Sequence, residues 1–175
     1  MKKFLTASTA LIGFGLSSLA LAVDGTITIK GEVSSKTCNI QTPTLNQTVQ
    51  LPVVSQSSLA SGQIAGFTPF AIALSSCTAG SKVKANFEIG PNVDPANGTL
   101  KNELSGADAS NVAVQLFNKD QQAIDLSTGS NNLEEVSGAG GNAVLGFFAA
   151  YLAPTDASVK PGQVSTSVTY TMSYE

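Results

Sequence analysis

The clearest pattern in this chain is the strict alternation of its last segment, VSTSVTYTMSYE, from Val164 to Glu175. A period of two predicts a β-strand with one buried face. Serine and threonine occupy the other face, which we expect to meet solvent. Because the strand ends with the chain, we expect no hairpin partner to follow it. The buried face would carry Val164, Thr166, Val168, Tyr170, Met172 and Tyr174.

Short strand-like runs continue through the rest of the chain. The segments between them are rich in glycine, serine, asparagine and proline, which favour turns. A helical stripe is weakly suggested only around VVSQSSLASG. We therefore predict a single all-β sandwich. The predicted strands are TCNIQ (37–41), TVQLPV (48–53), FTPFAIALSSC (67–77), KVKANFEI (82–89), NVAVQLFN (111–118) and AVLGFFAAYLA (143–153).

The first 22 residues have the features of a secretory signal peptide. Lys2 and Lys3 precede an apolar run, and Ala20-Leu21-Ala22 forms a small-x-small cleavage site. An uncleaved membrane anchor is the alternative, since the run is nearly long enough to span a bilayer. Removing 22 of 175 residues leaves 153, with seven lysines, twelve acidic residues and neither arginine nor histidine. This acidic balance disfavours nucleic-acid binding.

The two cysteines, Cys38 and Cys77, both lie in the predicted exported part. In an oxidising compartment an even count predicts one disulfide. A metal or redox pair is disfavoured, because there is no CxxC spacing and no histidine. Closing a loop with a sequence separation of 39 residues would contribute roughly 4 kcal/mol through the entropy of the unfolded chain.

A second alternating segment, DGTITIKGEV (24–33), precedes the first cysteine. It has the period of a strand but carries two glycines, which weaken an ordinary strand. If the sandwich lacks a strand beside its last one, this segment of a neighbouring copy could fill the gap by β-strand addition. Each copy would then give and receive a strand, so the assembly would be an open polymer. The inward-facing residues would be Gly25, Ile27, Ile29, Gly31 and Val33.

The sequence offers no catalytic constellation and no metal site. Histidine, the commonest acid–base group near neutral pH, is absent. Glu134 and Glu135 are adjacent in a polar loop, and we expect them to be solvated. SGAGGNAV (137–144) lacks the context of a phosphate-binding loop, and DPANGT (94–99) lacks calcium-loop spacing. The aromatic side chains lie mostly on predicted strands and are assigned to the core.

Taken in order, these segments resemble the subunits of chaperone–usher fimbriae, close in plan to the type 1 major pilins. The resemblance covers essentially the whole chain. It is carried by TITIKGEV, by TCNI, by FTPFAIALSSC, by NVAVQLFN and by the block FFAAYLAPTDASVKPGQVSTSVTYTMSYE.

This resemblance implies an incomplete immunoglobulin-like β-sandwich that lacks its seventh strand and is completed by donor-strand exchange. A periplasmic chaperone would first lend a strand, an outer-membrane usher would secrete the subunit, and the arm of the next subunit would replace the chaperone. We expect a signal peptide at 1–22, a donor-strand extension at 23–35 and a pilin domain at 36–175. The edge bound by chaperone or arm would carry Val164, Val168, Tyr170, Met172 and Tyr174.

The expected function is structural: a subunit of a surface fimbria that is exported through the periplasm and contributes to cell adhesion. Its partners would be identical or related subunits, the chaperone and the usher. We expect no enzyme activity, cofactor, metal, nucleic acid or small-molecule substrate. Two alternatives are a minor adaptor subunit of the same filament and a monomeric secreted sandwich that binds a glycan or a host protein.

Overall fold

A computed structural model describes residues 27–31, 33 and 38–175 of the chain. It divides the chain into two units, Met1–Glu32 and Val33–Glu175. Residues 27–31 of the first unit have no regular secondary structure, and the predicted signal peptide lies outside the described residues. In the part of the chain that is described, no helix has the length and apolar character needed to cross a membrane.

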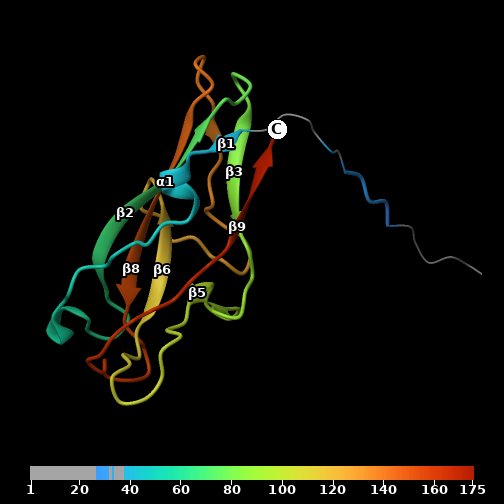
Figure 1. The fold of residues 1–175 in the computed structure, drawn as a ribbon. Coiled ribbons are helices and arrows are strands. Elements are labelled where there is room, and N and C mark those ends of the chain that lie inside the picture. Colours follow the sequence, from blue (N-terminus) through green and yellow to red (C-terminus); the bar gives the residue numbers. More distant parts are fainter. Residues whose placement is uncertain (1–26, 32, 34–37) are drawn as a thin grey trace, which may run out of the picture. The chain divides into compact units, whose positions relative to one another are not determined.

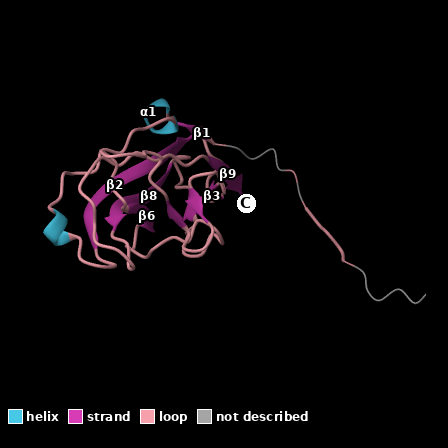
Figure 2. Cartoon of the chain, turned by 90° about the horizontal axis from the view of Figure 1, so that it is seen from below, coloured by secondary structure: helices cyan, strands magenta, loops and turns pink. Residues whose placement is uncertain are grey.

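The second unit consists of two antiparallel sheets (Figures 1 and 2). The larger sheet has the order β1-β2-β8-β6-β5-β4, and the smaller one has the order β7-β3-β9. Two short helical turns, α1 (Thr42–Leu45) and the 3-10 turn Gln56–Ser58, lie between the first two strands. The strands are β1 (Asn39–Ile40), β2 (Ile64–Ser75), β3 (Lys82–Phe87), β4 (Val93–Asp94), β5 (Thr99–Leu100), β6 (Ala113–Asn118), β7 (Glu135–Val136), β8 (Ala143–Leu152) and β9 (Tyr170–Tyr174).

The core lies between the two sheets and is built from alternate residues of the long strands. Phe70 of β2 pairs with Phe147 of β8, and their rings stack at 5.4 Å. Phe87 of β3 packs edge-on against the same Phe147 ring at 5.3 Å. The fully buried residues include Ile72, Leu74, Val83, Leu145 and Ile124. Alternate burial of this kind is what the period of two predicts.

A bulge interrupts the pairing of β2 with β8 between Ala65 and Thr68. Gly66 lies there with a φ of +77°, a conformation that other residues rarely adopt. A Cβ at this position would approach the Tyr151 ring to 3.1 Å. The glycine therefore permits both the bulge and the close packing of Tyr151.

The predicted disulfide is present and joins the chain before β1 to the chain after β2. Cys38 and Cys77 have their Cα atoms 4.3 Å apart. The next two residues, Asn39 and Ile40, pair with Ser75 and Leu74. The disulfide thus fixes the start of the sandwich to the end of its longest strand.

Of the predicted strands, one is absent among the described residues and the last is shorter than expected. TVQLPV (48–53) was expected to be a strand but has no ladder partner in the described structure. The last strand was expected from Val164, but β9 begins at Tyr170. A strand needs a neighbour for its backbone hydrogen bonds. Both segments border the same space between the sheets, and that space has no strand of the described residues in it.

Candidate functional site

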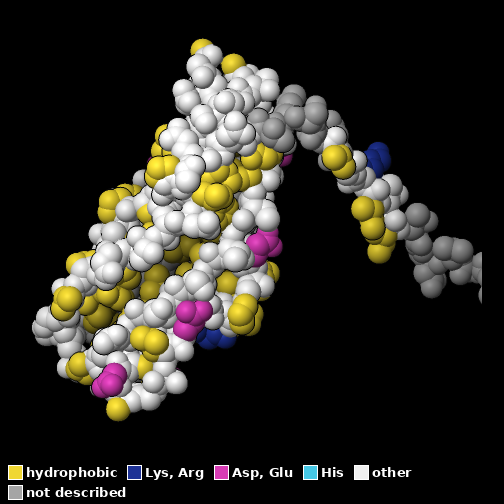
Figure 3. All heavy atoms as spheres, in the orientation of Figure 1, with side chains coloured by type: hydrophobic (Ala, Val, Ile, Leu, Met, Phe, Trp, Pro, Cys, Tyr) yellow, Lys and Arg dark blue, Asp and Glu magenta, His cyan; other side chains and the backbone are white. Residues whose placement is uncertain are grey.

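The candidate site is a groove with a volume of about 830 Å³ between residues 45–51 and residues 164–170. Figure 3 shows hydrophobic side chains exposed along the hollow. None of the described residues that line it is charged. Its floor is apolar and is formed by Ile40, Phe70, Ile72, Phe87, Leu100, Val114, Leu116, Ala149 and Tyr151.

The first wall is β9 together with the extended segment that precedes it. Lys82 and Glu175 exchange two backbone hydrogen bonds of 2.9 Å, and the Glu88 amide donates to the Thr169 carbonyl at 2.8 Å. The odd-numbered residues of this wall therefore turn their backbone groups toward β3. In an extended chain the even-numbered residues turn theirs the other way, toward the groove.

That inner edge is free. Among the described residues, the backbone groups of Val164, Thr166 and Val168 have no hydrogen-bond partner. Free N–H and C=O groups in a row are a template on which another strand can pair. The side chains of these three residues are half-buried and point to the core side, while Ser165 and Ser167 are exposed. The alternation predicted for this segment is thus confirmed.

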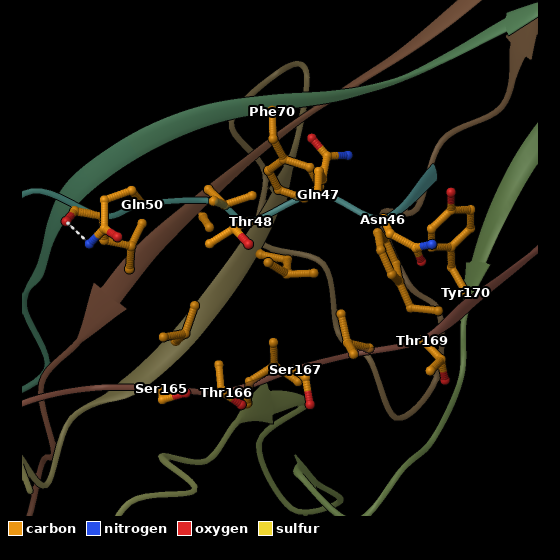
Figure 4. A pocket seen from close by; sticks show the side chains of 18 of the residues that line it. Asn46, Gln47, Thr48, Gln50, Phe70, Ser165, Thr166, Ser167, Thr169 and Tyr170 are labelled. Atoms are coloured by element: carbon orange, nitrogen blue, oxygen red, sulfur yellow. Dashed lines mark hydrogen bonds between the residues drawn. The ribbon is translucent and has the colours of Figure 1, made fainter. Parts of the chain in front are cut away.

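The second wall runs from α1 through Asn46, Gln47, Thr48 and Gln50 (Figure 4). Val49 and Leu51 turn inward and pack against the core. The Gln47 side chain donates to the Ala71 carbonyl of β2 at 3.0 Å, which ties this wall to the larger sheet.

Tyr170 connects the two walls at one end of the groove. Its hydroxyl donates to the Leu45 carbonyl at 3.2 Å, so the side chain reaches from β9 to the second wall. Burial raises the pKa of this tyrosine, and the nearby Tyr174 raises it further. The phenol is therefore neutral at ordinary pH and able to donate.

Thr166 is the one polar residue among the inward-facing positions 164, 166 and 168 of the first wall. Its hydroxyl oxygen is buried and has no partner among the described residues. A buried hydroxyl without a partner costs about 1–3 kcal/mol. A large apolar side chain placed above Thr166 would keep this hydroxyl buried without a partner. This part of the groove is therefore the least suitable for such a side chain.

The structure brings together some of the predicted edge residues. Val164, Val168 and Tyr170 line the groove. Met172 and Tyr174 continue the same face along β9, where they pair with β3 and pack against the core. Sequence reasoning did not identify residues 45–51 as the opposite wall, since TVQLPV gave a strand signal without a partner.

The predicted donor residues are described in part. The side chains of Ile27, Ile29 and Val33 are 91%, 90% and 101% exposed. Gly31 is described, and no atom lies within 4 Å of a Cβ built on it. Gly25 lies outside the described residues.

Of the paired glutamates, Glu134 is exposed as expected and Glu135 is half-buried, and each contacts a lysine. Glu134 lies 3.6 Å from the Lys82 amine. Glu135 belongs to β7 and forms an ion pair with Lys119, whose pKa is raised by this hydrogen bond. Within the described residues, no group of three or more histidine, cysteine, aspartate or glutamate side chains could hold a metal ion.

Comparison with known proteins identifies the family. The model of the family described as fimbrial protein matches residues 27–175. The chain belongs to the fimbrial protein family. It is 41% identical over 163 residues to the major fimbrial subunit SMF-1 of Stenotrophomonas maltophilia (strain K279a), a match that covers 89% of this chain and 95% of the relative.

Solved structures agree on the fold of this fimbrial subunit. The P pilus rod subunit PapA matches with a TM-score of 0.61 at 20% identity, over 79% of this chain and 99% of that one. A chaperone–usher pilus structure matches with a TM-score of 0.57 at 18% identity, over 86% and 95%. The predicted immunoglobulin-like pilin fold is confirmed, and the protein is a structural fimbrial subunit.

Proposed function

We propose that this subunit polymerises by inserting the segment 23–33 of one copy into the groove of the next. The observation that carries the proposal is the free backbone edge of Val164, Thr166 and Val168 above an apolar floor. An inserted strand would satisfy these backbone groups and bury its alternate side chains at once. Binding in this mode takes affinity from main-chain hydrogen bonds and specificity from the side-chain pockets.

The arm is long enough for the groove, and its apolar residues alternate as those of the groove wall do. The first wall of the groove consists of the seven residues 164–170, which is short enough for the segment 23–33 to run along all of it. Ile27, Ile29 and Val33 are exposed, and they recur with the period of two that a half-buried strand needs. The groove offers apolar contacts and no charge, which suits these side chains.

An antiparallel arrangement along β9 suits a filament best. It places Val33 beside Val164, at the end of the groove opposite to Tyr170, whose hydroxyl contacts Leu45 of α1 shortly after β1. The donor body, which begins at Cys38 and β1, would follow at that end after the four residues 34–37, which span at most about 14 Å. One end of each body would then meet the opposite end of the next, and this head-to-tail contact repeats without closing.

In this arrangement, Ile27 lies opposite Tyr170 and Ile29 opposite Val168. Gly31 then faces Thr166, and Val33 faces Val164. A glycine there leaves free volume above the Thr166 side chain, whose buried hydroxyl has no partner among the described residues. Gly31 thus falls where a bulky side chain is least acceptable.

Before assembly the inner backbone edge of residues 164–168 must be protected by another chain, because an exposed strand edge promotes aggregation. We propose that a periplasmic chaperone supplies that protection and that an outer-membrane usher exports the subunit to the filament. The family membership and the similarity to a chaperone–usher pilus support both steps. The shaft of the filament is the expected place of this subunit, in keeping with its similarity to a major fimbrial subunit.

Deletion of residues 23–33 tests the donor role. The truncated chain should fold and bind the chaperone but should not form the ladder of polymers that survives a denaturing gel without boiling. The matched control keeps the arm and replaces only the outward residues Thr28 and Lys30 by alanine, and it should polymerise normally. Ladders of normal length from the truncated chain would refute the proposal, and a full-length chain that stays monomeric would favour a secreted monomeric sandwich.

A further inference from the structure

The first wall of the groove is held from outside by side chains and by backbone groups of neighbouring loops. β3 ends at Phe87, and its last backbone bond reaches Thr169. Residues 163–167 are extended, but apart from a single parallel bridge between Gln163 and Ala109 they have no neighbouring strand on that side. Their outward-facing backbone groups are bonded by residues 92–103, which pass along this edge, and at Gln163 also by the backbone of Asp108 and Ser110.

The Asn102 side chain makes two of these bonds, to Gln163 and Ser165. Its side-chain carbonyl accepts from the Ser165 amide at 2.9 Å and from the Leu104 amide at 3.2 Å. Its side-chain NH₂ group donates to the Gln163 and Ser110 carbonyls, both at 2.9 Å. All the hydrogen-bonding groups of this half-buried amide are thus used, and two of its bonds are those that a neighbouring strand would make.

Asn92 and Glu103 continue the contact. The Asn92 side chain donates to the Ser167 carbonyl at 3.2 Å, and the Glu103 amide donates to the Ser165 carbonyl at 2.8 Å. The Ser167 hydroxyl donates to the Glu103 carboxylate at 3.0 Å. Every second backbone position along the outer edge, 163, 165 and 167, is therefore bonded.

We propose that Asn102, assisted by Asn92, is a positioning residue that keeps residues 163–167 extended while the groove is empty. This rests on the proposed function of the groove. An edge fixed from outside presents the backbone groups of Thr166 and Val168 to the incoming strand. The incoming arm then does not have to order the wall as it binds, and such preorganisation favours binding.

The positioning role predicts a different effect on empty and filled subunits. In a filled groove the inserted strand bonds the inner edge of the same wall, so the wall no longer depends only on the bonds at its outer edge. Loss of the amide should therefore slow insertion of the arm more than it weakens the finished polymer. A merely structural role would weaken both.

Asn111 provides a matched control. Its side chain donates to the Ser158 carbonyl at 3.0 Å and accepts from the Lys160 amide at 2.6 Å. It therefore joins neighbouring loops at the same end of the unit, but it makes no hydrogen bond to residues 163–167. Asn111→Ala removes two side-chain hydrogen bonds, against the four that Asn102→Ala removes, and it leaves the wall of the groove untouched.

The experiment follows polymerisation of the full-length mature chain and then the temperature at which the polymers dissociate. Asn102→Ala should slow polymerisation about tenfold, which corresponds to about 1.4 kcal/mol. Asn111→Ala should stay within about twofold of the unmodified chain. The dissociation temperature of Asn102→Ala polymers should equal that of Asn111→Ala polymers. Hydrogen exchange of the Ser165 amide should be faster in the Asn102→Ala subunit before polymerisation.

Asn102→Asp is the second variant, in case alanine prevents folding. It keeps the acceptor for Ser165 and loses the two donated bonds, so a smaller delay is expected. Equal delays for Asn102→Ala and Asn111→Ala, or a lower dissociation temperature with an unchanged rate, would overturn the proposal. A failure of the proposed donor mechanism would be seen in a different experiment. In that case a chain that lacks residues 23–33 would still polymerise, with either asparagine or alanine at position 102.

Discussion

Replacing Ile29 by alanine should weaken the hold of one subunit on the next. Ile29 is 90% exposed in the isolated chain and would be buried in the groove beside Val168. The change removes three side-chain carbons, each of which stabilises the buried state by about 0.8 kcal/mol. The loss is about 2.4 kcal/mol, so the equilibrium constant for release of the arm should rise about 50-fold.

The assay titrates preformed polymers with guanidinium and measures the fraction of chains released, using denaturing gels without boiling. The matched control is Thr28→Ala, which changes an outward-facing position of the same arm. Ile29→Ala should release chains at a clearly lower denaturant concentration, and Thr28→Ala should behave as the unmodified chain. If the two variants shift the midpoint equally, or if neither shifts it, the alternating burial of the arm is wrong.

Three further changes have definite expected outcomes. Cys38→Ser with Cys77→Ser should remove roughly 4 kcal/mol of stability and lower the amount of subunit in the periplasm; normal levels would contradict this. Because burial raises the pKa of Tyr170, its neutral hydroxyl stabilises the fold fully below pH 10.0, and this contribution is lost as the pH rises through the raised pKa. Tyr170→Phe should therefore show a smaller fall in unfolding temperature above pH 10.0 than the unmodified chain. Gly98→Ala should destabilise by more than Gly129→Ala in thermal unfolding, since both have positive φ but only Gly98 has backbone within 3 Å of the added Cβ.

The long strands could be predicted from the sequence because their burial repeats with a fixed period. β2, β6 and β8 lie within or close to the predicted runs, and the inward face of residues 164–174 is the one that the alternation indicated. Strand boundaries depend on partners as well as on pattern. Residues 164–169 carry the same alternation as β9, yet they have no strand neighbour and are not part of a sheet.

Only one of the two walls of the groove could be predicted from the sequence. The first wall was identified from the C-terminal alternation, but the second wall depends on how α1 and Gln47 place residues 45–51 over the core. Asn102 gave no signal at all, because it is one asparagine in a polar loop, KNELSGADAS. Its importance depends on four bonds to residues that are distant in the sequence or lie across a turn.

The short elements show a related limit. The segment DPANGT (94–99) lies between predicted strands and was expected to be a turn. Asp94 and Thr99 do flank a turn, but they also pair with each other as part of the two-residue strands β4 and β5. Two residues are too few to show a period, so such strands cannot be recognised from a pattern. The ion pairs of Glu134 and Glu135 could not be predicted either, since the lysines that they contact come from other parts of the chain.

The central claim is that the arm of one copy occupies the groove of another, and a disulfide cross-link tests it most directly. Residues directly opposite in an antiparallel pair have their Cβ atoms about 4.5–5.5 Å apart. Filaments of a chain that carries both Ile29→Cys and Val168→Cys should therefore oxidise to ladders that survive boiling and collapse on reduction. The control pair, Ile29→Cys with Thr169→Cys, should not link. Filaments of the first variant that yield only monomers after boiling, or a cross-link confined within single chains, would contradict the account.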